Sequence, residues 1–136
     1  MTTSPDPAGA TSTSTPAELV TRYFDAVNGH DWDTLAEIFH PEVTIQHGMS
    51  LSSTGREKAI KLLAAVVAQF ATHEDRPTRQ LVAGDAVAVE IEFVGTLPDG
   101  TIVEFPAADL FDTDGKQITR VQSWYDTAVV LPRLKR

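Results

Sequence analysis

The chain has 136 residues, 42% of them apolar and 22% charged, which suits one globular domain with its own core. Its formal net charge of −8 disfavours nucleic acid and anionic membranes as partners, and the absence of cysteine excludes disulfides and cysteine chemistry. No apolar run approaches the ~20 residues of a membrane span, and the N-terminus does not resemble a secretory signal, so we expect a cytoplasmic protein.

The chain is predicted to divide into a leader, one domain and a short tail. Residues 1–14 contain no large apolar side chain except the initial methionine and are therefore expected to be a disordered leader. The domain is expected to cover residues 15–130, and residues 131–136 read as a solvated basic tail.

Three helices and a short strand are predicted in the first half. Thr15 and Glu18 form a capping box with proline at the first helical position, and an apolar stripe follows until Asn28-Gly29 ends the helix. A short second helix begins at Asp31 or Asp33 and stops at Pro41. Residues 43–47 read as a strand. A second capping box, over residues 54–57, opens a helix that reaches about Phe70.

The second half reads as strands. Residues 80–83, 87–94, 101–111 and 117–127 have β-rich composition and alternation, and turns at 98–100 and 112–115 join the last three as hairpins. The predicted order is α-α-β-α-β-β-β-β. This order indicates an α+β fold with helices packed on one face of an antiparallel sheet.

Three polar side chains interrupt apolar faces. His47 shares a strand face with Val43 and Ile45, because alternate residues of a strand point the same way. Asp109 shares its face with four apolar residues, and the hydroxyl of Tyr23 lies on the inward stripe of the first helix. Each has an ordinary structural explanation as a rim histidine, a hydrogen-bonded aspartate or a core tyrosine. A functional site requires that the three converge.

Other polar residues favour a surface location. Glu90 and Glu92 alternate with apolar residues and are expected to face solvent or a partner subunit, and His30, His40 and His73 are expected at the surface. No histidine pair has metal-ligand spacing, no glycine-rich phosphate loop follows a strand, and Gly-x-Ser-x-Gly is absent. We therefore expect no metal site and no cofactor.

The ordered motifs resemble those of ketosteroid-isomerase-like proteins of the nuclear-transport-factor-2-like superfamily, which includes SnoaL-like polyketide cyclases and limonene-epoxide-hydrolase-like enzymes. The resemblance runs through residues 22–31, 35–39 and 43–45, the start of the third helix at 55–60, and the last hairpin at 109–116. It implies a cone-shaped fold in which a curved sheet wraps the helices and a hydrophobic pocket opens at one end. It also implies that the chain forms a homodimer through the outer sheet face.

The resemblance also implies roles for the three polar residues. Tyr23 and a protonated Asp109 correspond to the oxyanion-hole donors of the steroid isomerases, a family that is the standard example of a carboxylic acid kept neutral by an apolar site. His47 stands where those isomerases have a carboxylate base. This difference argues against steroid isomerisation itself, although histidine suits proton transfer at neutral pH.

The other subfamilies correspond less well. Cyclases and limonene-type epoxide hydrolases carry an aspartate on the last strand, where this chain has Ser123, and Asp126 would lie on the opposite strand face. The epoxide hydrolases also carry an Arg-x-Asp pair that corresponds here to Glu90 and Glu92. Epoxide hydrolysis of that type is therefore not expected.

The leading hypothesis is an enzyme that forms an enolate from a small hydrophobic carbonyl compound and isomerises, cyclises or cleaves it. His47 would take the proton while Tyr23 and Asp109 bind the enolate oxygen, and apolar side chains would hold the body of the substrate: Val43, Ile45, Val103, Phe105, Phe111 and Tyr125. In a variant, an ionised Asp109 orients His47 as a dyad. The alternative is a binding module without turnover.

Overall fold

A computed structural model describes residues 14–49 and 51–134. Residues 1–13 of the predicted leader and residues 135–136 of the predicted tail lie outside this part of the chain. The elements, in order, are α1 (Pro16–Gly29), α2 (Trp32–Ile38), β1 (Phe39–His47), β2 (Leu51–Thr54), α3 (Arg56–Val67), β3 (Thr72–Ala83), β4 (Ala86–Thr96), β5 (Ile102–Thr113), β6 (Ile118–Trp124) and α4 (Thr127–Leu134).

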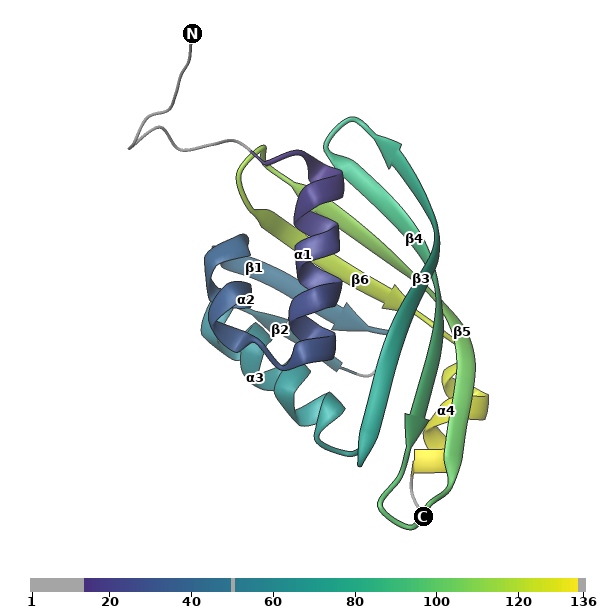
Figure 1. Cartoon of the computed structure of the whole chain (residues 1–136). Helices are drawn as coiled ribbons and strands as arrows, with labels where there is room; N and C mark the ends of the chain where they lie inside the picture. Colours follow the sequence, from purple (N-terminus) through teal and green to yellow (C-terminus); the bar gives the residue numbers. More distant parts are fainter. Residues whose placement is uncertain (1–13, 50, 135–136) are drawn as a thin grey trace, which may run out of the picture.

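The strands form one curved, open sheet in the order β2-β1-β6-β5-β4-β3. Every strand pair is antiparallel except β1 with β6, which run parallel. Figure 1 shows α1 lying across the concave face of the sheet, with α2 and α3 beside it. The predicted α+β cone is thereby confirmed, with the refinement that one strand pair is parallel.

The first helix begins as the sequence predicts. The Thr15 hydroxyl accepts a hydrogen bond from the backbone N–H of Glu18 at 3.1 Å, and the Glu18 carboxylate accepts one from the N–H of Thr15 at 2.8 Å. These two bonds satisfy free N–H groups at the start of the helix. The apolar stripe that follows is buried, so α1 has one fixed rotation against the sheet.

The second predicted capping box is wrong. Thr54 ends strand β2, and Gly55, at a φ of 103°, precedes the helix without any side-chain capping bond. The strand β2 was not predicted, because only four residues form it and three of these are exposed. Helix α3 then ends at Val67, before the predicted end near Phe70, and β1 begins at Phe39 rather than at residue 43.

Strand β3 is longer than its predicted part, residues 80–83. It begins at Thr72 and has a register shift between Pro77 and Arg79. Proline is tolerated here because β3 is the last strand of the sheet, where one edge needs no ladder partner. Most side chains of this edge strand are exposed and many are polar, so its sequence lacks the alternation of apolar and polar residues that predicts a strand.

A fourth helix, α4, replaces the end of the last predicted strand and the start of the predicted tail. The Asp126 carboxylate accepts a hydrogen bond from the Val129 N–H at 3.2 Å, and the Asp126 carbonyl accepts one from the Val130 N–H at 2.9 Å. Asp126 therefore starts this helix. The β-branched Val129 and Val130, together with Pro132 inside the helix, give the segment low helix propensity, which explains why it read as strand and tail.

The core lies between the concave sheet face and the helices, and its fully buried large side chains include Leu35, Ile38, Phe39, Ile118 and Val121. Of the helices described, none has both the length and the apolar character needed to cross a membrane.

Candidate functional site

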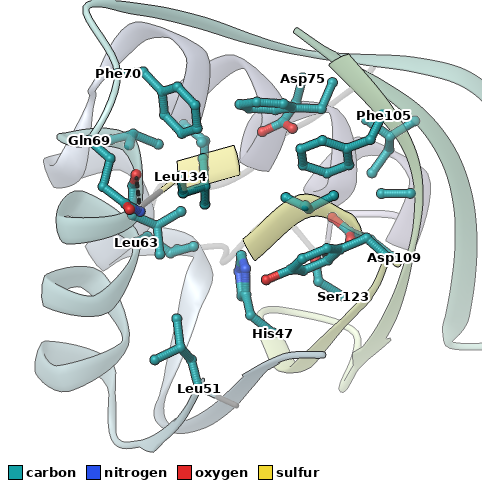
Figure 2. Close-up of a pocket in the computed structure, with 18 of the residues that line it drawn as sticks. His47, Leu51, Leu63, Gln69, Phe70, Asp75, Phe105, Asp109, Ser123 and Leu134 are labelled. Atoms are coloured by element: carbon teal, nitrogen blue, oxygen red, sulfur yellow. Dashed lines mark hydrogen bonds between the residues drawn. The ribbon is translucent and has the colours of Figure 1, made fainter. Parts of the chain in front are cut away.

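A cavity of about 220 Å³ lies between the concave sheet face, α1, α3 and α4. Tyr23, His47 and Asp109, the three residues singled out in the sequence, all line it. Figure 2 shows His47 and Asp109 directed into the same space, with Ser123 beside them. The requirement that the three polar residues converge is met.

The predicted apolar walls are only partly right. Phe105 and Tyr125 line the cavity, and the structure brings both to the same wall. Val43, Ile45, Val103 and Phe111 do not line it; each is at most 1% exposed and packs in the interior. Phe111, for example, is covered by the Tyr23 ring at a centroid distance of 5.0 Å. These four side chains lie on the inner face of the sheet, as predicted, but other buried side chains pack over them and separate them from the cavity.

Tyr23 is held by aromatic neighbours. Its ring packs edge-on against Phe24 and Phe111, at centroid distances of 5.1 and 5.0 Å, and only 3% of the residue is exposed. Burial, and then the charges of Asp109 and Asp75, raise the pKa of the hydroxyl well above its usual value. The hydroxyl is therefore a proton-bearing hydrogen-bond donor at any physiological pH.

Asp109 is bonded to Ser123, a partner that the sequence did not reveal. The Ser123 hydroxyl donates a hydrogen bond to a carboxyl oxygen of Asp109, and both side chains are buried. Burial raises the pKa of Asp109 to about 7, although the bond from Ser123 works in the opposite direction. Asp109 is thus available as a neutral acid near neutral pH, as the resemblance implied.

His47 lines the cavity and carries a buried nitrogen, Nε2, that forms no hydrogen bond to the described residues. Burial lowers the pKa of the imidazole to about 4. The ring is therefore neutral at pH 7 and can accept a proton. No hydrogen bond joins His47 to Asp109 among the described residues, so the His47–Asp109 dyad is not formed; the Asp109 carboxyl bonds Ser123.

His47, Ser123 and Asp109 lie side by side on three neighbouring strands. His47 on β1 is the register partner of Ser123 on β6, and Ser123 is the register partner of Asp109 on β5. Neighbouring strands are about 4.8 Å apart, so the backbones of His47 and Asp109 are separated by about 10 Å, with Ser123 between them. Their inward side chains can therefore reach one small molecule.

Asp75 is a fourth polar group that the sequence analysis missed. It lies on β3, lines the cavity, and has its pKa raised to about 6 by burial. The side-chain amide of Asn28, at the end of α1, donates to the Asp75 carbonyl and accepts from the Asp75 N–H, both at 2.9 Å. This pair of bonds fixes the backbone of Asp75 against the helix. The available sequence signal was that residues 73 and 75 would share one face of a strand. The residues around them are polar, so neither face could be recognised as the inner one.

Helix α4 and the end of α3 supply further lining that was not predicted. Leu131 and Leu134 from α4, and Gln69 and Phe70 after α3, line the cavity. The expected basic tail is therefore, as far as residue 134, a helix whose apolar side chains cover part of the site.

The remaining predictions about polar residues differ in outcome. Glu90 and Glu92 are exposed, as expected. His30 is exposed, but His73 is half-buried and its Nε2 lies 2.7 Å from Nε2 of His30, while His40 is also half-buried and accepts a hydrogen bond from the Glu42 N–H. Within residues 14–49 and 51–134, no three histidine or acidic side chains gather in a way that could hold a metal ion.

The sequence profile of the SnoaL-like domain matches residues 20–121, which include Tyr23, His47, Asp75 and Asp109. The chain belongs to the SnoaL-like domain family. Curated proteins gave no match to the chain. The family assignment agrees with the resemblance found in the sequence motifs.

Solved structures share the SnoaL-like fold. A protein of ketosteroid-isomerase-like fold from Catenulispora acidiphila, crystallised in complex with trimethylamine, is 30% identical, with a TM-score of 0.77 over 88% of this chain and 92% of that one. A protein from Jannaschia sp. CCS1, provisionally described as a SnoaL-like polyketide cyclase, is 22% identical, with a TM-score of 0.80 over 96% and 97% of the two chains. An epoxide hydrolase of the limonene-hydrolase type from M. tuberculosis is 18% identical, with a TM-score of 0.75 over 88% of each chain.

Proposed function

We propose that this SnoaL-like protein is an enzyme that uses its own side chains for acid–base chemistry on a small hydrophobic carbonyl compound. The observation that carries the proposal is a buried Asp109, bonded to Ser123, in one cavity with Tyr23 and His47. A protonated acid and a phenol, both buried and lining one cavity, are suited to stabilise an enolate oxygen. The reaction is isomerisation, aldol-type cyclisation or a related lyase step.

In the proposed mechanism, neutral His47 takes a proton from the carbon next to the carbonyl group. The electron pair of that C–H bond forms a carbon–carbon double bond, and the π pair of the carbonyl group moves to its oxygen, which becomes an enolate oxygen and accepts hydrogen bonds from Tyr23 and Asp109. His47 then returns the proton to another carbon, which completes an isomerisation. In a cyclisation, the enolate carbon instead attacks a second carbonyl group and closes a ring, and the alkoxide formed there takes the proton from His47. Phe105 and Tyr125 hold the apolar body of the substrate.

The low pKa of His47 limits its strength as a base in the empty cavity. Formation of the enolate strengthens His47 as a base, because a negative charge that develops beside the imidazole favours its protonated form. The proton transfer is therefore most favourable when the two donors and the base act on the same bound molecule.

Exchange of the proton next to the carbonyl group tests the proposal before the substrate is known. Small cyclic ketones in D₂O lose the NMR signal of that proton when an enzyme forms their enolate, whichever product follows. We expect exchange with the wild-type chain, none with His47→Ala, and a loss of about 100-fold or more with Tyr23→Phe. Exchange that survives the His47 substitution would contradict the assignment of the base.

The second candidate is ligand binding without turnover. It is supported by the Catenulispora relative, whose crystal structure contains a small organic molecule. In this case Tyr23, His47 and Asp109 would orient the ligand, and ketone exchange would be absent while binding persisted.

We further propose that the chain forms a homodimer through the outer face of the sheet. Trp124 is 46% exposed and lies beside Ala108 in the register, and Leu110 on the same face is 38% exposed. Trp124 also borders a shallow hollow with Pro106 and Ala108. Light scattering should give twice the chain mass for the wild type and for the control Lys58→Glu, at an exposed position on α3, and one chain mass for Trp124→Glu. A wild-type monomer would contradict the proposal.

A further inference from the structure

Asp75 stands at one end of a row of aromatic residues. In the sheet register, Asp75 on β3 pairs with Phe93 on β4, and Phe93 pairs with Phe105 on β5. All three side chains line the cavity. Figure 2 shows Asp75 and Phe105 directed into the space that His47 faces from β1. A carboxyl group and aromatic rings therefore border the same part of the cavity.

The rings form a continuous wall. Phe93 and Phe105 are stacked with centroids 4.8 Å apart, Phe70 packs against Phe93 at 5.1 Å, and Phe105 packs against Tyr125 at 5.4 Å. The faces of such rings carry partial negative charge and attract cations. The wall and the carboxyl group are thus two features that favour the same ligand charge.

Among the described residues, no positively charged side chain pairs with the carboxyl group of Asp75. This group has no hydrogen bond or ion pair to them, since the two bonds from Asn28 involve its backbone. The adjacent Arg76 bonds Glu74 at 2.8 Å, and none of the described lysine and arginine side chains lines the cavity. His47, the one imidazole in the lining, is neutral at pH 7.

We propose that the cavity binds a small organic cation, with an alkylammonium nitrogen held between the carboxylate of Asp75 and the ring of Phe93. The cation supplies the charge that the lining lacks, and the rings bind its alkyl groups. The inference rests on the proposed function in that it gives the substrate a basic nitrogen at the end opposite its carbonyl group. Binding requires no turnover, so the two proposals can fail separately.

A pair of probes with the same shape tests the charge directly. Phenyltrimethylammonium and tert-butylbenzene differ mainly in the exchange of a charged nitrogen for a carbon. In NMR titrations of the full chain at pH 7.5, the ammonium probe should bind about tenfold more tightly or better. Equal affinities, or tighter binding of the neutral probe, would overturn the proposal.

Variants assign the preference to Asp75. Asp75→Asn keeps the size of the side chain and removes its charge, so it should abolish the preference for the ammonium probe. Asp25→Asn, an exposed change of the same charge on α1, should retain it. Persistence of the preference in Asp75→Asn would also overturn the proposal. If that variant does not fold, Phe93→Leu decides, because loss of the ring should weaken binding of the ammonium probe severalfold more than binding of tert-butylbenzene.

The pH dependence has a defined sign. Ammonium affinity should rise between pH 5 and 7, because Asp75, with its pKa of about 6, loses its proton in this range. The other titratable groups in the lining are Tyr23, Tyr125, His47 and Asp109, and half-buried His73 precedes Asp75 on β3. In Asp109→Asn the rise should persist, which separates the two carboxyl groups. An affinity independent of pH in that variant would contradict the role of Asp75.

Ketone exchange and ammonium binding distinguish the two proposals. Ammonium binding without ketone exchange would leave this inference intact and disfavour the proposed enzyme. Ketone exchange without any preference for the ammonium probe would do the reverse.

Discussion

The hydroxyl of Ser123 donates a hydrogen bond to Asp109 across the β5–β6 pair. This bond occupies one oxygen of the carboxyl group and fixes its plane, while the group remains part of the cavity lining. When Asp109 is protonated, its O–H can donate to a ligand. Ser123 is thus a positioning residue for the donor that the proposed mechanism needs.

Substitution of Ser123 should change the pKa of Asp109 in a known direction. The hydrogen bond lowers this pKa, so Ser123→Ala should raise it above about 7. Titration of the Asp109 carboxyl carbon by NMR measures the change. The exposed substitution Ser52→Ala serves as the control and should leave the pKa as it is in the wild type. A lower pKa in Ser123→Ala would show that the bond does not favour the ionised form.

The substitution Asp109→Asn distinguishes between two roles of Asp109, a neutral hydrogen-bond donor and an ionised carboxylate. If Asp109 acts as a protonated donor, Asp109→Asn keeps an N–H donor at this position and should retain ketone exchange within about tenfold of the wild type. An ionised, charge-stabilising Asp109 predicts a loss that approaches that of His47→Ala. Exchange rates of the two variants at pH 7, compared with the wild type, decide between these roles.

The free energy of unfolding should fall as pH rises from about 4 to and through 7. The pKa of Asp109 is about 7 in the folded chain and about 3.9 in the unfolded chain, so the folded state binds more protons between these values. The free energy of unfolding therefore decreases with pH across this window. Asp75 acts in the same direction up to about pH 6. His47 acts in the opposite direction between about pH 4 and 6.5, because burial lowers its pKa.

Above pH 6.5, Asp109 is the main one of these three groups that still titrates. Between pH 6.5 and 8 the wild type should lose about 1 kcal/mol more of unfolding free energy than Asp109→Asn does. Urea unfolding at pH 6.5 and 8 measures this difference, with Asp25→Asn as the charge-matched control. An identical loss in the wild type and Asp109→Asn would contradict the raised pKa.

The sequence was informative where its periodicity was strong. The helical stripe through Tyr23 and the alternation around His47 and Asp109 predicted which way these side chains point, and the structure confirms all three directions. The sequence could not reveal which strands become neighbours. Ser123 was therefore noted only as the position where related enzymes carry an aspartate, and its bond to Asp109 follows from the strand register. Asp75 was hidden for another reason: its strand is exposed and polar, and burial comes from the helix that crosses it.

Gly95 makes room for the aromatic wall of the cavity. A Cβ atom added at this position would lie 2.6 Å from Cδ1 of Phe70 and 3.0 Å from Cε2 of Phe93, so the Phe70 ring would have to move. Gly95→Ala should therefore lower the free energy of unfolding by about 1–3 kcal/mol, the usual cost of overpacking, and weaken binding of phenyltrimethylammonium. Gly29→Ala is the matched control, because a Cβ atom there meets no atom within 4 Å. Urea unfolding and probe titration measure both effects, and a Gly95→Ala chain as stable as Gly29→Ala would show that Phe70 moves aside at no cost.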